Sequence, residues 1–187
     1  MRPRFRIAAA ASAAALAISG LSLLAPAAQA AGTSTTFTLS GGALSISVPA
    51  SANLTPSAVA TGTATLSGTL GSTSVTDARG NLTATWTVTV ASTDFQTGTN
   101  TANETVPKAN VSYGSGLASS SGTGSFTPGT VASLSGVAPA TQIGASWAGV
   151  SNNSSSWNPT IGVILLNANN TAAVNGTYSG TITQSVT

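Results

Sequence analysis

The sequence contains no cysteine and no histidine, and only five basic and three acidic residues occur among its 187 positions. Without these residue types the chain cannot build a Ser-His-Asp triad, a Cys-His pair or most kinds of zinc site. Glycoside hydrolysis needs two carboxylates, but we expect Asp94 and Glu104 to be solvated loop residues. The composition therefore predicts a protein without enzymatic activity, cofactor or metal. A calcium site built from Asp77 or Asp94 and loop carbonyls is the alternative.

The basic charge of the chain is concentrated at its beginning. Three arginines within residues 1–6 precede an apolar stretch that runs to about residue 25, and the small-residue site Ala28-Gln29-Ala30 follows. This arrangement predicts a secretory signal peptide over residues 1–30, cleaved after Ala30, with cleavage after Ala28 as the alternative. We therefore expect a secreted protein, extracellular or associated with the cell wall, whose mature chain is one domain over residues 31–187.

Few charges remain after this segment. Two basic residues, Arg79 and Lys108, stand against three acidic ones, so the net charge of residues 31–187 is −1. No basic patch is left to hold phosphates, and we do not expect nucleic acid as a partner. The last residues show neither a hydrophobic tail nor an LPxTG-like motif, so we expect no covalent or membrane anchor in the mature chain. A surface with so few charges is prone to self-association.

An unbroken alternation from Leu82 to Val90 is the clearest pattern in the mature chain. Apolar side chains point one way, and four threonines point the other. A period of two over nine residues predicts a strand with one buried face, on which Trp86 is core rather than ligand. Residues 72–77 form the expected preceding strand, and the turn Arg79-Gly80-Asn81 predicts that the two strands pair as a hairpin.

Asp77 and Arg79 share a face with Val75, because they lie at a spacing of two. If Val75 points into the core, the carboxylate and the guanidinium lie at its margin. Buried charges are usually paired. We therefore interpret Asp77 and Arg79 as an ion pair that locks the hairpin rather than as ligand-binding residues.

Short alternating segments separated by turn residues recur along the whole mature chain. The expected strands are 36–40, 44–48, 60–70, 72–77, 82–90, 106–113, 126–137, 161–166 and 177–187. We expect the first two to form a hairpin through Gly41-Gly42, and 114–124 and 151–156 to be loops. The pattern predicts an all-β fold, a single antiparallel β-sandwich of the Ig-like or Greek-key type, with a barrel as the alternative. Trp147 and Trp157 flank the second loop and are candidates for a glycan-stacking platform.

Two regions of the chain resemble the signatures of the WxL-domain proteins of Gram-positive bacteria. Residues 75–80, followed by Trp86-Thr87-Val88, resemble the first signature, an Asp-x-Arg-Gly turn followed by Trp-x-Leu. Residues 176–183 resemble the closing Gly-Thr-Tyr strand, which carries the second Trp-x-Leu. This chain has Val88 in place of leucine, and Gln184-Ser185-Val186 in place of the second motif. A polar amide thus replaces an indole on an apolar face, and it needs hydrogen-bond partners if it is buried.

The resemblance implies a secreted β-rich domain that associates non-covalently with the cell wall. The implied binding partner is peptidoglycan, another wall polymer or other surface proteins. The implied wall-binding motif positions are Trp86, Val88, Gln184 and Val186. One alternative function is a self-assembling structural subunit of an extracellular layer or filament, because uncharged strands with unpaired edges invite strand addition. A second alternative is a carbohydrate-binding adhesin that uses Trp147 or Trp157.

Overall fold

The computed structural model describes residues 33–54, 60–62, 64–136 and 142–187. The predicted signal peptide lies outside the described residues. In the described part of the chain no helix is long and apolar enough to cross a membrane. The strands are β1 (Leu44–Ser47), β2 (Thr65–Thr69), β3 (Thr73–Asp77), β4 (Trp86–Ser92), β5 (Phe95–Gln96), β6 (Thr105–Val106), β7 (Val111–Gly114), β8 (Ser119–Pro128), β9 (Thr130–Val131), β10 (Ile143–Trp157), β11 (Thr160–Ile164) and β12 (Ile182–Val186), with the 3-10 helices η1 (Ala102–Glu104) and η2 (Lys108–Asn110).

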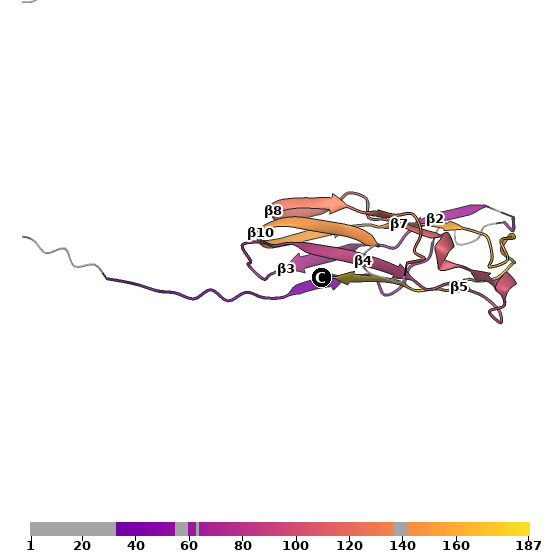
Figure 1. Cartoon of the computed structure of the whole chain (residues 1–187), viewed down its shortest axis with the longest axis horizontal. Helices are drawn as coiled ribbons and strands as arrows, with labels where there is room; N and C mark the ends of the chain where they lie inside the picture. The colour runs from indigo at the N-terminus through magenta and orange to yellow at the C-terminus, as the bar shows by residue number, and fades with distance from the viewer. Residues whose placement is uncertain (1–32, 55–59, 63, 137–141) are drawn as a thin grey trace, which may run out of the picture. The chain divides into compact units, whose positions relative to one another are not determined.

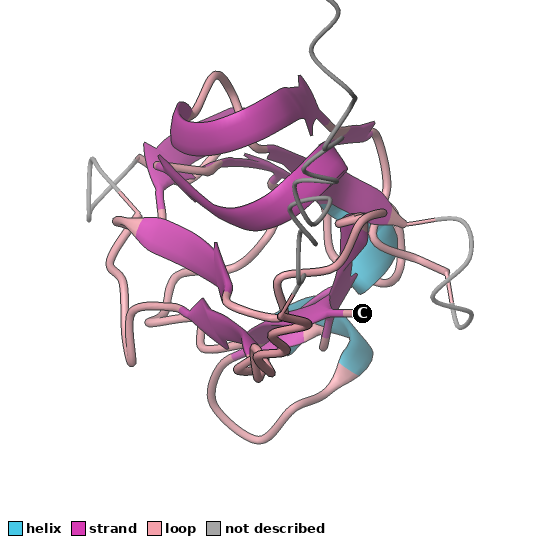
Figure 2. Cartoon of the chain, turned by 90° about the vertical axis from the view of Figure 1, so that its left-hand side faces the viewer, coloured by secondary structure: helices cyan, strands magenta, loops and turns pink. Residues whose placement is uncertain are grey.

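The described residues from 38 to 187 form an all-β, sandwich-like unit of antiparallel sheets, as the sequence predicts (Figure 1). The first sheet has the order β1-β3-β10-β4-β12, and β8 also pairs with β10. The second sheet has the order β2-β11-β7-β9, and β5 pairs with β6. The view along the strands shows that they surround a common interior (Figure 2). Side chains from both sheets meet there in one hydrophobic core.

Strand β10 is the centre of the first sheet. The first part of β10 pairs with β4, its last part pairs with β3, and β8 follows it along nearly its whole length. The register with β8 shifts between Val150 and Ser154, and Ser151 has a φ of 61° in this interval. Such a bulge bends a strand and increases its twist. Strand β10 therefore pairs with β4 along its first part and with β3 along its last part.

The alternation predicted from the sequence is present in β4. Trp86, Val88 and Val90 are buried, and the threonines between them are half-buried. The strand begins later than the sequence predicts, because Leu82 is 88% exposed and lies in the connection 78–85. Ala84 is the first buried residue of the series.

Two predicted hairpins are absent from the described chain. Residues 36–40 form no strand, and β1 pairs with β3 instead. Strands β3 and β4 do not pair with each other, because β3 lies between β1 and β10, and β4 lies between β10 and β12. The connection 78–85 is held by the β10 bulge: Ala84 N–H donates to the carbonyl of Gly149, and Ser151 N–H donates to the carbonyl of Asn81. A long strand elsewhere in the sequence thus replaces the expected local partner.

Two segments predicted to be loops are strands. Residues 119–124 belong to β8, and residues 151–156 belong to β10. Serine and glycine are poor strand formers, but context often outweighs propensity in sheets. The ladder between β8 and β10 is supported by hydroxyl pairs, with 2.8 Å between Ser120 Oγ and Ser155 Oγ and 3.0 Å between Ser121 Oγ and Ser154 Oγ. Gly122 has a φ of 109°, which a residue with a side chain rarely adopts.

Two leucines that differ in exposure give a direct test of this core. Leu134 is fully buried, whereas Leu82 is exposed. We expect Leu134→Ala to lower the free energy of unfolding by about 2–5 kcal/mol, because it removes buried methyl groups and leaves a cavity. Leu82→Ala should change it by less than about 0.5 kcal/mol. Urea denaturation of both variants measures the difference, and equal losses would contradict the described position of Leu82.

Candidate functional site

The three tryptophans of the chain form one buried cluster. Trp86 lies nearly parallel to Trp147, with ring centroids 6.4 Å apart and an interplanar angle of 11°. It lies in the same way against Trp157, at 6.3 Å and 15°. Phe126 packs on Trp157 with a centroid distance of 5.3 Å. The exposure of each tryptophan is at most 3%.

This burial contradicts the glycan platform predicted from Trp147 and Trp157. The prediction assumed a loop between them, but both lie on β10, which continues through that segment. Their rings face the interior, and the Nε1 atom of Trp147 has no hydrogen-bond partner among the described residues. Neither ring offers a face to a ligand in this structure.

Asp77 and Arg79 form the predicted ion pair. Arg79 Nε donates to Asp77 Oδ1 at 2.9 Å, and Nη2 donates to Oδ2 at 2.8 Å. The backbone N–H of Arg79 also donates to Oδ1, at 3.0 Å, and Nη2 reaches the carbonyl of Thr85. The side chain of Asp77 is fully buried, and that of Arg79 is 30% exposed. The pair ties the connection 78–85 to β3, so its role is structural even though β3 and β4 form no hairpin.

Hydrogen bonds extend from this pair to the tryptophan cluster. Asn153 Nδ2 lies 3.5 Å from Asp77 Oδ2, and Trp86 Nε1 donates to Asn153 Oδ1 at 2.8 Å. The hydrogen bonds from Arg79 hold the pKa of Asp77 below its usual value, against the opposing effect of burial. Reciprocally, the bond to Asp77 raises the pKa of Arg79. The carboxylate is therefore ionised at neutral pH, and its oxygens are occupied.

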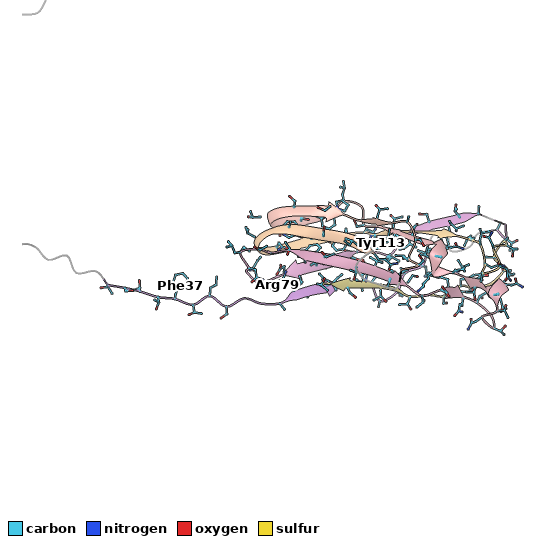
Figure 3. All side chains as sticks on the ribbon, in the orientation of Figure 1. Phe37, Arg79 and Tyr113 are labelled. Carbon is cyan, nitrogen blue, oxygen red and sulfur yellow. The ribbon has the colours of Figure 1, made fainter. Side chains whose placement is uncertain are left out.

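Gln184 is buried and has the partners that its amide requires. Tyr113 donates its hydroxyl to Gln184 Oε1 at 2.9 Å, and Gln184 Nε2 donates to Thr73 Oγ1 at 3.2 Å. Trp157 Nε1 donates to the hydroxyl of Tyr113 at 3.1 Å. Burial raises the pKa of Tyr113 to about 12, so this hydroxyl stays protonated over the ordinary pH range. Figure 3 shows Tyr113 within the sandwich and Arg79 near one of its ends.

The two motif regions lie on neighbouring strands. Val88 of β4 is opposite Val186 of β12, and Val90 is opposite Gln184. Trp86, Val88 and Gln184 are buried, and Val186 is partly buried. The motif positions therefore contribute to the core, and they do not form a surface that a polymer could touch.

The candidate metal ligands are not gathered into a site. Among the described residues, no group of three or more histidine, cysteine, aspartate or glutamate side chains is close enough to hold an ion. The carboxylate of Asp77 is held by Arg79, and Asp94 Oδ1 accepts a hydrogen bond from the backbone N–H of Lys108 at 2.8 Å. Glu104 Oε2 accepts from Thr99 and Thr101.

A groove of about 510 Å³, which we call the tyrosine groove, was not foreseen from the sequence. Its base includes the buried residues Val106 and Val163, and exposed polar groups also line it, among them Asn53, Asn175 and Thr177. The half-buried residues Phe95 and Tyr178 contribute aromatic rings. No charged residue is among the described lining residues. The lining comes from segments far apart in the sequence, so no local pattern could have predicted it.

The ion pair makes the stability of the domain dependent on pH. Because the pKa of Asp77 is lower in the folded than in the unfolded state, its contribution is present above the unfolded value of about 3.9. This contribution is lost as the pH falls through the folded pKa. We expect Asp77→Asn to cost about 1.5–3 kcal/mol at pH 7 and to reduce the loss on acidification. Urea unfolding between pH 7 and pH 2 measures this, with Asp94→Asn as the control, because an asparagine at this position can still accept the hydrogen bond from the backbone N–H of Lys108.

A double-mutant cycle tests the buried amide. Gln184→Leu should lower the free energy of unfolding by about 1–3 kcal/mol, because the hydroxyls of Tyr113 and Thr73 lose a buried partner. Combination with Tyr113→Phe should give a coupling energy above about 0.5 kcal/mol. Ser185→Ala, on the exposed face of the same strand, should be additive with Tyr113→Phe. Additivity of the Gln184 pair would contradict the hydrogen bond.

Comparisons with known proteins give no match to a family model, to a curated protein or to a solved structure. Neither a family nor a relative therefore assigns a role to any residue of this chain. Among the described residues, the tyrosine groove is an accessible concave surface.

Proposed function

We propose that this protein is a secreted, non-enzymatic surface domain that associates non-covalently with the bacterial cell wall, and that the tyrosine groove holds an uncharged stretch of a wall polymer. One observation carries the proposal. The segment 176–178, which belongs to the second region of resemblance to WxL-domain proteins, lines this groove. The segment that carries the second part of the resemblance therefore also lines an accessible groove.

The chemistry of the lining suits a glycan strand. Sugars present hydroxyl and amide groups together with apolar C–H faces, which amide, hydroxyl and aromatic side chains recognise. The groove offers amides from Asn53 and Asn175, hydroxyls from Thr61 and Thr177, and the rings of Phe95 and Tyr178. Its described lining has no cation to attract an anionic polymer. We therefore favour the neutral glycan of peptidoglycan as the ligand.

The motif tryptophan acts indirectly in this proposal. Trp86 is buried and hydrogen-bonded to Asn153, so it stabilises the fold that presents the groove. Gln184 has a similar role through Tyr113 and Thr73. Loss of the second tryptophan of the WxL pattern is therefore compatible with wall binding, because that position lies in the core.

Sedimentation with purified native sacculi tests the proposal. Residues 31–187 should pellet with the sacculi, and Asn175→Ala combined with Thr177→Ala should weaken binding by about five-fold or more, the equivalent of one net hydrogen bond. Asn152→Ala is the matched control, since Asn152 is an exposed asparagine that does not line the groove. Absence of the wild-type protein from the pellet would refute wall association. Equal binding by both variants would refute the proposal that the tyrosine groove is the binding site.

A further inference from the structure

The first sheet curls until its two outer strands meet at a seam. Strands β1 and β12 lie at opposite ends of the strand order and contact each other, but no ladder joins them in the described chain. Thr87 and Thr187 exchange both backbone hydrogen bonds, at 2.9 and 3.0 Å. Because bonded pairs alternate in an antiparallel ladder, the N–H and C=O groups of Ile182 and Gln184 point away from β4, toward the seam. No backbone hydrogen bond from the rest of the described chain reaches them.

A cavity of about 170 Å³, which we call the edge cavity, lies at this seam. Ile182 and Gln184 of β12 line it, and so do residues 48–52, which follow β1. Leu54, Leu70 and Ile161 add apolar side chains. No charged residue is among its described lining residues. The edge cavity therefore combines an apolar lining with peptide groups to which no described residue is hydrogen-bonded.

The edge cavity adjoins the tyrosine groove. Ala52, Leu54 and Phe95 line both hollows. Gly180 lines the edge cavity, and a Cβ atom built on it would lie 2.8 Å from Cγ of Phe95, so the ring packs directly on the backbone of this glycine. A chain molecule that lies in the groove can therefore place a short side group in the edge cavity.

We propose that the edge cavity is the subsite that receives an N-acetyl group of the glycan strand in the tyrosine groove. This inference rests on the proposed function, and it narrows the ligand from a neutral glycan to an N-acetylated one. An acetamido group carries one N–H and one C=O, as a peptide unit does, and it ends in a methyl group. It offers a donor and an acceptor to the peptide groups of Ile182 and Gln184, and its methyl group to Leu70 and Ile161.

The size and the chemistry of the edge cavity favour this group over other substituents of a polysaccharide. A cavity of about 150 Å³ is large enough to bind benzene, so the edge cavity has room for the smaller acetamido group. A hydroxyl group would leave the apolar lining uncovered and the peptide groups incompletely paired. A carboxylate would find no cation among the described lining residues.

Two tetrasaccharides with the same cellulose-type backbone separate this inference from the proposed function. Chitotetraose carries an acetamido group on each sugar where cellotetraose carries a hydroxyl group. In titration calorimetry, residues 31–187 should bind chitotetraose about ten-fold more tightly, because a hydrogen bond and the burial of a methyl group are gained. Equal affinities would overturn the N-acetyl subsite and leave glycan binding in the groove intact. Binding of neither tetrasaccharide would overturn both, while sedimentation with sacculi decides wall association separately.

Variants at the rim of the edge cavity identify it as the source of this preference. Ala50 is exposed and lines the edge cavity but not the tyrosine groove. Ala50→Phe should lower the affinity for chitotetraose to that for cellotetraose, because the ring occupies the cavity, and should leave cellotetraose binding unchanged. Ala109→Phe is the matched control, since Ala109 is exposed and lines neither hollow. Asn175→Ala combined with Thr177→Ala should weaken the binding of both tetrasaccharides. A preference for chitotetraose that survives Ala50→Phe would overturn the proposal.

Discussion

Strand β10 holds the first sheet together, because its backbone pairs with β3, β4 and β8 while its side chains supply two of the three tryptophans of the core. Its bulge also places Asn153 between Trp86 and Asp77. A buried carboxylate, a buried amide and an indole N–H all find hydrogen-bond partners around Asn153. Without β10, Asp77 would lose Asn153 as its second partner, and Trp86 would lose both indole rings that stack on it.

The interior is unusually polar for a domain with few large apolar residues. Asp77, Asn153, Gln184 and Thr73 are buried beside the aromatic rings, and each has a hydrogen-bond partner. Satisfied polar networks of this kind favour one arrangement of the core over others, because any alternative leaves a buried group unpaired. Short valine side chains supply much of the remaining core, so the hydrogen bonds also help to fix the packing of the two sheets.

Local patterns in the sequence predicted the features that depend on local contacts. The period of two identified β4, the spacing of Asp77 and Arg79 identified their ion pair, and the apolar face around Gln184 indicated that its amide needs partners. The strand character of 151–156 could not be predicted in the same way. Serine and asparagine have weak preferences of their own, and β8 and β3, which stabilise this segment, lie far from it in the sequence. The tyrosine groove depends on the same kind of long-range contact.

The ion pair of Asp77 and Arg79 also affects how a trypsin-like protease can cleave this protein. After residue 30 the chain has only two basic residues, Arg79 and Lys108, at which a trypsin-like enzyme could cut. Such an enzyme must take the guanidinium of Arg79 into its specificity pocket, but Asp77 and the carbonyl of Thr85 already hold it. Cleavage at this position has to wait for the connection 78–85 to open locally, so its rate reports the stability of that connection. An arrangement that satisfies a buried charge thereby protects one of the two tryptic sites that follow residue 30.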